Sequence, residues 1–316
     1  MSASKQDGSN LVVIAALLAN LGIAVAKFVA AAITGSSSML TEGFHSVVDS
    51  FNQVLLLYGQ RRGRRPPDHA HPFGYGRELY FWSFVVAILI FGVGAGVSIY
   101  EGWVHWKDPE ELRDPLVNYI VLGVALALEG TSWFLAVREF STANRGRGWW
   151  AAVRQSKDPA GFIVLFEDSA ALAGLLVAGV GVWASHAWND PRIDGLASIL
   201  IGLILGVVAA LLAREAKGLL IGEAADPEVV ARVRKIVDAR PEITHVNHVR
   251  TLHTAPQSIF VAISADFRDT LTMGDAETLI EEIETALKAA EPNLSSIYIR
   301  PEKREDAAVL PGAPRD

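Results

Sequence analysis

Three titratable side chains interrupt an apolar stretch at residues 38–60 that is long enough to cross a lipid bilayer. Glu42, His45 and Asp49 are three and four residues apart, so on a helix they share one face, with Asn52 a turn further on. A carboxylate at the bilayer centre costs at least about 2.5 kcal/mol, so this stripe must face a partner or a watery path. Imidazole and carboxylate are both donors that divalent metal ions accept. The pattern predicts His45 and Asp49 as metal ligands, and Glu42 either as a ligand nearer the outer surface or as a packing or gating residue.

A second pair of acids lies within the apolar stretch at residues 160–184. Glu167 and Asp168 are adjacent, so on a helix their side chains point about 100° apart and only one can face a given site squarely. Several carboxylates that face each other in a low dielectric repel, unless a cation or protons neutralise them. We therefore expect the two stretches to pack together with their acids around a cation.

The types of ligand restrict which cation is suitable. One imidazole with two or three carboxylates suits tetrahedral Zn²⁺, is tolerable for Co²⁺, Fe²⁺ or Mn²⁺, and does not suit sulfur-seeking Cu⁺. The chain has no cysteine, so it offers neither a thiolate site nor a disulfide. Because imidazole and carboxylate must lose protons before they bind a metal, metal and protons compete for the site. This competition is a chemical basis for exchanging one for the other.

Three further polar residues lie inside apolar stretches. Asn20 is in the middle of residues 11–33, where a hydrogen bond to a neighbouring helix is one interpretation. Lys27, in the same stretch, is expected to extend its ammonium group toward the membrane surface. Glu129 is an isolated acid within residues 116–137, and both a hydrogen bond to a neighbouring helix and a role in a proton path remain open.

The apolar stretches that must position these residues occur six times. Hydrophobic residues make up 51% of the 316, and the mean hydropathy is +0.28, which is higher than a soluble domain of this size normally shows. Each stretch has about the 20 residues needed to span the hydrocarbon layer. The stretches cover residues 11–33, 38–60, 80–100, 116–137, 160–184 and 194–213. We predict an integral membrane protein with six transmembrane helices in a domain at residues 11–217, preceded by a short tail at residues 1–10.

Basic residues are unevenly distributed among the loops. The loop after the second stretch carries Arg61, Arg62, Arg64, Arg65 and Arg77, and the loop after the fourth carries Arg145, Arg147, Arg154 and Lys157. The alternate loops carry few. Because basic loops stay on the cytoplasmic side, both termini are expected in the cytoplasm, and the expected membrane is the bacterial inner membrane.

The chain beyond Arg214 has the texture of a small soluble domain, at residues 218–303, with a disordered end at residues 304–316. Asp226 and Pro227 are typical of a helix N-cap and first turn. Residues 258–267 alternate as a strand does, residues 275–291 form an amphipathic helix pattern, and LSSIYIR at residues 294–300 indicates a last strand. The order helix, strand, strand, helix, strand predicts a cytoplasmic α+β domain.

Four motifs together resemble the cation diffusion facilitator family of divalent-metal/proton antiporters. They are HSVVD in the second stretch, the acid pair in the fifth, DHAHPFGYGRELYFW leading into the third, and DGLASILIGLIL opening the sixth. The resemblance implies a tetrahedral site formed by the second and fifth helices, with His45, Asp49 and Asp168 among its ligands. It also implies a homodimer that alternates between inward-facing and outward-facing states, and a tail of metallochaperone-like, ferredoxin-like fold that serves dimerisation. The segment VLFEDSAALAG is most similar to the divergent branch that contains the animal mitochondrial zinc transporter.

The chain departs from that family at the fourth ligand. The family usually has a His or Asp four residues before the final Asp, and here that position is Val164. Glu167 is the nearest substitute, while water or Asn20 are alternatives.

Two further family sites are also altered. In the loop before the third stretch, Asp68 and His71 match a second zinc site, but the last ligand of that site is replaced by Tyr75. Phe73, Gly74 and Tyr75 are expected to form a tight structural turn. In the tail, the positions that bind zinc in some relatives read Asn247, Ser264, Tyr298 and Arg300, so we expect no zinc cluster there.

The functional interpretation is a secondary active transporter that exports a divalent metal cation, first of all Zn²⁺, from the cytoplasm in exchange for protons. Mn²⁺, Fe²⁺ or Co²⁺ are alternative substrates. A membrane metalloenzyme is less favoured because HExxH and a Gly-flanked serine nucleophile are absent from the sequence. A scaffold that does not transport is the third alternative. We expect no enzyme activity, no cofactor besides the transported ion, no nucleic-acid partner at a net charge of -7, and a homodimer within a lipid bilayer.

Overall fold

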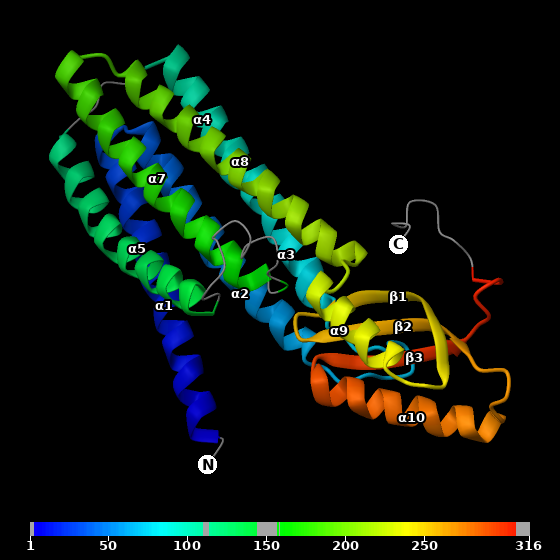
Figure 1. Ribbon diagram of the computed structural model, residues 1–316. Coiled ribbons are helices and arrows are strands. Elements are labelled where there is room, and N and C mark those ends of the chain that lie inside the picture. Colours follow the sequence, from blue (N-terminus) through cyan, green and yellow to red (C-terminus); the bar gives the residue numbers. More distant parts are fainter. Residues whose placement is uncertain (1–2, 110–113, 144–156, 158, 308–316) are drawn as a thin grey trace. The chain divides into compact units, whose positions relative to one another are not determined.

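The computed structural model describes residues 3–109, 114–143, 157 and 159–307 (Figure 1). Two compact units divide the chain. One unit comprises Met1–Arg64 and Glu78–Lys217, and the other comprises Arg65–Arg77 and Gly218–Asp316. The loop that follows the second apolar stretch therefore belongs to the same unit as the C-terminal domain.

All regular elements among the described residues of the first unit are helices. Its elements are α1 (Ala3–Thr34), α2 (Ser37–Gly63), α3 (Glu78–Leu89), the π-helical segment η1 (Ile90–Ala95), α4 (Gly96–Lys107), α5 (Pro115–Ala143), α7 (Pro159–Trp188) and α8 (Arg192–Ile221). The helix α1 already begins at Ala3, so most of the predicted tail at residues 1–10 is helical. The segments α3, η1 and α4 follow one another without a break and form the third predicted stretch.

Four helices of the described part are long and apolar enough to cross a membrane: Glu78–Lys107, Pro115–Thr142, Gly161–Trp188 and Arg192–Ile221. The helix α1 contributes a shorter apolar segment, Asn20–Thr34. The 27 residues of α2 extend over about 40 Å, but the polar stripe lowers its apolar character. The structure thus confirms four of the six predicted spans by length and composition, and the two at α1 and α2 stay predictions.

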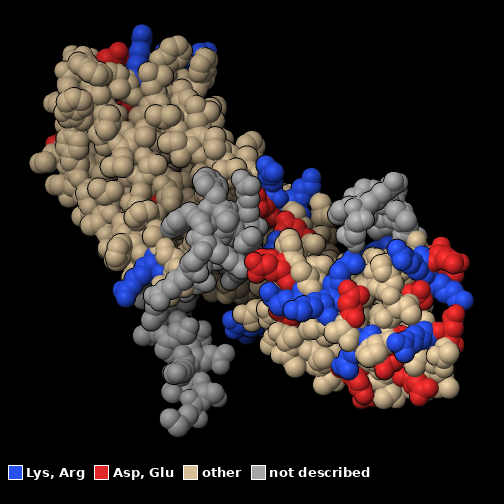
Figure 2. All heavy atoms as spheres, viewed as in Figure 1, with Lys and Arg blue, Asp and Glu red and all other residues tan. Residues whose placement is uncertain are grey.

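The surface of the helical unit is apolar. Large aliphatic side chains such as Leu176, Val180 and Leu203 are 59%, 63% and 53% exposed, which suits contact with lipid rather than with water. Figure 2 shows few charged residues on the visible body of this unit, whereas the visible surface of the other unit is covered with both signs of charge. The two surfaces match a membrane domain and a water-exposed domain.

The helix α2 lies among its neighbours, in contact with α1, α3, α4 and α7, and α5 packs on α7 and α1. Glycines allow close approach elsewhere in the bundle. A Cβ on Gly102 of α4 would lie 2.6 Å from the carbonyl oxygen of Gly195 in α8. Small residues at such crossings are typical of helices that associate in lipid.

A buried polar cluster fixes the beginning of α2. The carboxyl group of Asp194, in the first turn of α8, accepts hydrogen bonds from the Ser36 hydroxyl at 3.1 Å, from the Ser38 backbone N–H at 3.1 Å and from the Ser38 hydroxyl. Ser36 is also the N-cap of α2 and accepts from the N–H of Met39. Since Asp194 is fully buried, this set of donors supplies the hydrogen bonds that the carboxyl group would otherwise make with water.

The C-terminal domain contains α9 (Pro227–Asp238), β1 (Ile243–Ala255), β2 (Ser258–Phe267), α10 (Met273–Ala290) and β3 (Leu294–Pro301). The element order is the one predicted. The sheet order is β1-β2-β3, with β1 antiparallel and β3 parallel to β2. Asp226 caps α9 as expected, accepting from the N–H of Glu228 at 2.9 Å, and Thr272 and Asp275 form a capping box on α10.

The core of this domain lies between the sheet and the two helices. Its most buried members are Val233 and Val237 of α9, Val246 of β1, Val261, Ile263 and Ala265 of β2, and Ile283 and Leu287 of α10. These are the apolar positions of the amphipathic patterns in the sequence. The predicted disordered end at residues 304–316 falls mostly outside the described residues.

The loop at residues 65–77 packs on this domain. The ring of Phe73 meets that of Phe260 on β2 edge to face, with centroids 5.7 Å apart. A Cβ on Gly76 would lie 2.5 Å from the Cβ of Ala255, so only glycine allows this approach. Gly74 has a φ of +80° and donates its N–H to the carbonyl of His71 at 2.9 Å, which confirms the predicted tight turn.

Candidate cation site

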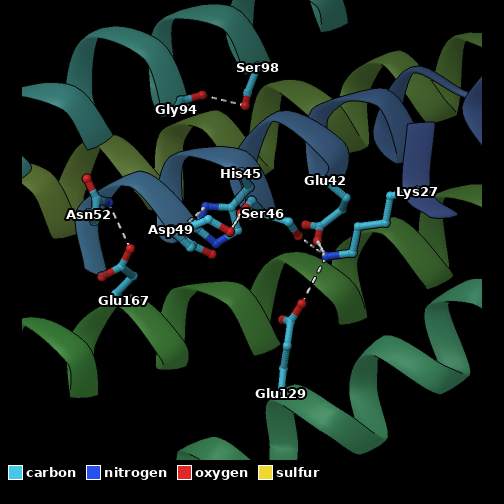
Figure 3. A network of polar contacts seen from close by, with 11 residues as sticks. Lys27, Glu42, His45, Ser46, Asp49, Asn52, Gly94, Ser98, Glu129 and Glu167 are labelled. Atoms are coloured by element: carbon cyan, nitrogen blue, oxygen red, sulfur yellow. Dashed lines mark hydrogen bonds and ion pairs between the residues drawn. The ribbon is translucent and has the colours of Figure 1, made fainter. Parts of the chain in front are cut away.

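The polar stripe of α2 lies inside the helical unit (Figure 3). Glu42 and Asn52 are fully buried and His45 is 1% exposed. The Nδ1 of His45 lies 3.4 Å from Oδ1 of Asp49, one turn along the helix. Neither ring nitrogen of His45, nor Oδ1 of Asp49, has a hydrogen-bond partner within the described residues. Buried polar atoms normally have partners, so these donors are available to a ligand.

The acids of α7 face this stripe as expected. Glu167 is 5% exposed, and its Oε1 accepts a hydrogen bond from the side-chain amide of Asn52 at 2.8 Å. The carboxyl groups of Asp49 and Glu167 are close enough to interact directly. Two neighbouring carboxyl groups repel each other when both are charged, so this pair favours a shared proton or a bound cation.

The two adjacent acids of α7 contact different helices. Glu167 points toward α2, whereas Asp168 accepts a hydrogen bond from Ser132 of α5 at 3.2 Å. The 100° step between consecutive helical residues produces this divergence. The structure therefore brings Glu167, rather than Asp168, next to Asn52 and Asp49.

A cavity of about 210 Å³ lies between α1, α2, α5 and α7. Its walls carry four acids, Asp49, Glu129, Glu167 and Asp168, together with Asn20, Ile23, Ser46, Gln53, Leu128, Ser132, Val164 and Ala171. Since a water molecule takes about 30 Å³ in the liquid, the cavity has room for a cation with several waters. Val164, at the family's usual ligand position, is part of the wall, so its side chain offers the cavity no donor atom.

Glu42 takes part in an ion pair. Its Oε2 lies 3.0 Å from Nζ of Lys27, and Nζ also donates to Ser46 at 2.9 Å and lies 3.0 Å from Oε1 of Glu129. The expectation that Lys27 reaches the membrane surface was wrong, because its side chain is fully buried. Two carboxylates and a hydroxyl replace the water that the ammonium group loses. Glu42 is not among the residues that line the cavity.

The candidate ligands are close together but are not arranged as a finished metal site. Within the described ranges, no three His, Asp or Glu side chains stand in an arrangement that would hold a metal ion. His45 and Asp49 supply a pair of donors, and Glu167 is held by Asn52. A third ligand thus requires Glu167 or Asp168 to turn toward that pair, or a donor from another helix.

The loop residues Asp68 and His71 form a hydrogen-bonded turn. Oδ1 of Asp68 accepts from the N–H groups of Ala70 and His71 at 3.0 and 2.7 Å, and Oδ2 accepts from the hydroxyl of Tyr75 at 2.7 Å. The His71 and Tyr75 rings stack at 4.2 Å. The Tyr75 hydrogen bond, with the two N–H groups, lowers the pKa of Asp68 below its usual value. Tyr75, at the sequence position where the resemblance implies a histidine ligand, is thus hydrogen-bonded to Asp68.

Hydrogen bonds also join Asn247 and Ser264, two of the tail positions at which the resemblance raised the question of a zinc cluster. The side-chain amide of Asn247 donates to the Ser264 hydroxyl at 3.0 Å and to the carbonyl of Glu302 at 2.9 Å. The Ser264 hydroxyl donates to the carboxylate of Glu302 at 2.5 Å. Burial and the neighbouring Arg250 lower the pKa of His248, which lies opposite Ser264 in the sheet. The absence of a zinc cluster here stays a prediction.

The fold and the cavity define a multi-pass membrane protein with an acidic site between its helices. The family model for the cation efflux transmembrane domain matches residues 13–221, and the model for the cation efflux protein cytoplasmic domain matches residues 225–304. The chain belongs to the cation efflux family, and its relatives in that family are transporters and not enzymes.

Several relatives extend this result. The mitochondrial proton-coupled zinc antiporter SLC30A9 of Xenopus laevis is 31% identical over 87% of this chain and 51% of its own length. Metal tolerance protein C4 of Arabidopsis thaliana is 32% identical over 72% of this chain and 50% of its own length. The manganese efflux system protein MneP of Bacillus subtilis is 22% identical over 95% of this chain and 97% of its own length. The chain thus spans about half the length of the first two.

Proposed function

We propose that this chain is a secondary active transporter that exports a divalent metal cation, first of all Zn²⁺, in exchange for protons. The observation that carries the proposal is the pair of helices α2 and α7: His45 lies one turn from Asp49, and Asp49 and Glu167 both line an acidic cavity. Donor atoms without partners in a membrane interior are costly unless they serve a ligand.

Zinc is supported by the chemistry of the donors and by the relatives. One imidazole with carboxylates suits Zn²⁺, which accepts nitrogen and oxygen ligands in a tetrahedral arrangement. The SLC30A9 relative is named as a zinc antiporter, whereas the MneP relative is named as a manganese efflux protein. Mn²⁺, Fe²⁺ and Co²⁺ are therefore the alternatives to test in competition with Zn²⁺.

Exchange for protons follows from the ligands that the site provides. His45, Asp49 and the α7 acids bind a metal in their deprotonated forms, so a proton and a metal cannot occupy the same donor atom. Release of the metal on one side of the membrane allows the carboxyl groups to take up protons, which relieves the repulsion between Asp49 and Glu167. The protonated, metal-free transporter can then change back to the conformation that opens to the other side of the membrane.

The arrangement in the cell is part of the same proposal. The arginines of the loop after α2 favour cytoplasmic termini, with the C-terminal domain in the cytoplasm and the helices in a bacterial inner membrane. The match of residues 225–304 to the cytoplasmic domain of cation efflux proteins supports a homodimer that assembles partly through this domain.

A transport assay tests this function. The full chain is reconstituted into liposomes with an acidic interior, and the uptake of Zn²⁺ against its gradient is followed with an internal fluorescent indicator. We expect the wild type to take up Zn²⁺ and the Asp49→Asn variant to show no uptake. The matched control is Ser50→Ala, because within the described residues the Ser50 hydroxyl donates to its own helix, at the carbonyl of Ser46. Zinc uptake by Asp49→Asn at the wild-type rate would show that the site is wrong, and no uptake by the wild type would favour a scaffold.

A further inference from the structure

Lys27 joins three helices through one ammonium group. From α1, its Nζ lies 3.0 Å from Oε2 of Glu42 on α2 and 3.0 Å from Oε1 of Glu129 on α5 (Figure 3). The Ser46 hydroxyl completes the set at 2.9 Å. The two carboxylates are equivalent in their distance to the lysine.

Glu42 and Glu129 differ in what surrounds them on the side away from Lys27. Glu42 is fully buried, lies against Gly174 of α7 and does not line the cavity. Glu129 lines the cavity together with Asp49 and Asp168, and its side chain is 16% exposed. Its second oxygen, Oε2, has no hydrogen-bond partner within the described residues. Glu129 therefore holds the lysine with one oxygen and has the other free for a ligand.

One carboxylate can pair with a lysine through one oxygen and bind a metal ion through the other. Metal ions accept carboxylate through a single oxygen, so an ion pair at one oxygen does not prevent ligation at the other. The lysine fixes the side chain of Glu129 and offsets one of the negative charges near the cavity. This chain also needs a further donor, because Val164 stands where the family usually has a ligand.

We propose that Glu129 of α5 is a further oxygen ligand of the transported cation and that Lys27 is the residue that positions it. The inference rests on the proposed function and deepens it. The cation is then held by α2, α7 and α5, and Lys27 connects α1 to the same site. The bound ion then contacts α2, α5 and α7 directly and α1 through Lys27. Its binding can therefore change how these four helices pack, rather than only α2 and α7.

The matched pair of variants is Glu129→Gln and Glu42→Gln. Each removes one negative charge at the same distance from Lys27, but only the first removes a carboxylate that reaches the cavity. Zn²⁺ affinity of the full chain in detergent is measured by competition with a chromophoric chelator. We expect Glu129→Gln to weaken zinc binding by about tenfold or more and Glu42→Gln to change it by less than about threefold. Equal losses in both variants, or wild-type affinity in Glu129→Gln, would overturn the proposal.

Cobalt spectroscopy separates ligation from a structural role. The visible absorption of Co²⁺ bound to the full chain reports the number and type of its ligands, so Glu129→Gln should change the band positions and intensities while Glu42→Gln leaves them as in the wild type. If Glu129→Gln does not fold, Glu129→Asp retains the charge and shortens the reach, and it should still alter the cobalt spectrum. A folded Glu129→Asp variant with the wild-type spectrum and wild-type zinc affinity would contradict the proposal.

The failure of this inference is distinguishable from the failure of the proposed function. Loss of zinc binding in Asp49→Asn together with wild-type binding in Glu129→Gln removes Glu129 from the ligands and leaves the α2–α7 site intact. Wild-type binding in Asp49→Asn removes the site itself.

Discussion

The side-chain amide of Asn52 donates a hydrogen bond of 2.8 Å to Oε1 of Glu167, which is 115 positions later in the chain. In this orientation of α7, Glu167 rather than Asp168 faces the polar stripe of α2. The family resemblance had pointed to Asp168 as the ligand of this helix. The geometry favours Glu167 as the acid that joins His45 and Asp49, with Asp168 at the wall shared with α5.

Substitution of the two acids separately tests that assignment. Glu167→Gln is expected to weaken Zn²⁺ binding by at least about tenfold, or about 1.4 kcal/mol, because it removes a charged donor beside Asp49. Asp168→Asn should cause a smaller loss, since its carboxyl group faces Ser132. Binding is measured by chelator competition on the purified chain, with Ser132→Ala as the control for the Asp168 hydrogen bond. A larger loss in Asp168→Asn would return the ligand role to the residue that the resemblance indicated.

Val164 allows the site to be improved rather than damaged. Its side chain lies in the cavity wall, at the position where the family usually has a His or Asp. Val164→His should add a nitrogen donor and tighten zinc binding by about tenfold, because zinc prefers four ligands from nitrogen, oxygen or sulfur. Val164→Leu, which adds volume without a donor, is the control. Equal affinity in Val164→His and the wild type would mean that this position does not face the bound ion.

The buried carboxyl group of Asp194 should contribute to stability. It accepts hydrogen bonds from Ser36 and Ser38 at the beginning of α2, and hydrogen bonds to a charged group contribute about 1.5–3 kcal/mol each. Asp194→Asn is expected to destabilise the helical unit by about 2 kcal/mol, visible as a lower melting temperature in detergent. The control is Ser37→Ala, which removes the bond between the Ser37 and Ser198 hydroxyls and leaves the hydrogen bonds of Asp194 in place. An unchanged melting temperature in Asp194→Asn would show that the cluster adds nothing.

The turn at Asp68 should depend on pH in a defined direction. Because hydrogen bonds from Tyr75 and two backbone N–H groups lower its pKa, the charged form is the stabilised one. Its contribution is therefore complete above the ordinary pKa of 3.8 and is lost as the pH falls through the lowered value. Hydrogen exchange at the amides of Ala70 and His71 should be faster in Tyr75→Phe than in the wild type at neutral pH. Identical exchange in both proteins would show that the hydroxyl does not hold the turn.

The sequence predicted the pairing of α2 with α7 because polar groups at helical spacing in two apolar stretches have few other places to go. It also predicted the order of elements in the C-terminal domain, since Asp226 and Pro227 mark a helix start and residues 258–267 alternate as a strand. These signals are local and follow from the periodicity of helix and strand.

Other features depend on partners that are distant in the sequence. Lys27 was expected to reach the surface, whereas its side chain is bound by Glu42 and by Glu129, 102 positions away. Three charged residues in separate apolar stretches were a signal for such a network, but their spacing does not show which helices are neighbours. The choice between Glu167 and Asp168 similarly requires the rotation of α7, which no single stretch contains.

The contacts of the loop at residues 65–77 likewise could not be predicted from its own sequence. The sequence predicted a tight turn at Phe73, Gly74 and Tyr75, and the structure confirms it. That Phe73 meets Phe260 and that Gly76 approaches Ala255 depends on the shape of a sheet formed almost 200 residues later.

The central claim is that a divalent cation binds between α2 and α7, and the position of the ion tests it most directly. Crystals of the full chain grown with Zn²⁺ are measured at the zinc absorption edge, and an anomalous difference map locates the metal. The account predicts a peak about 2.0–2.2 Å from a ring nitrogen of His45 and from carboxylate oxygens of Asp49 and Glu167. A peak confined to Asp68 and His71, or no peak within reach of His45 and Asp49 in crystals that contain zinc, would contradict it.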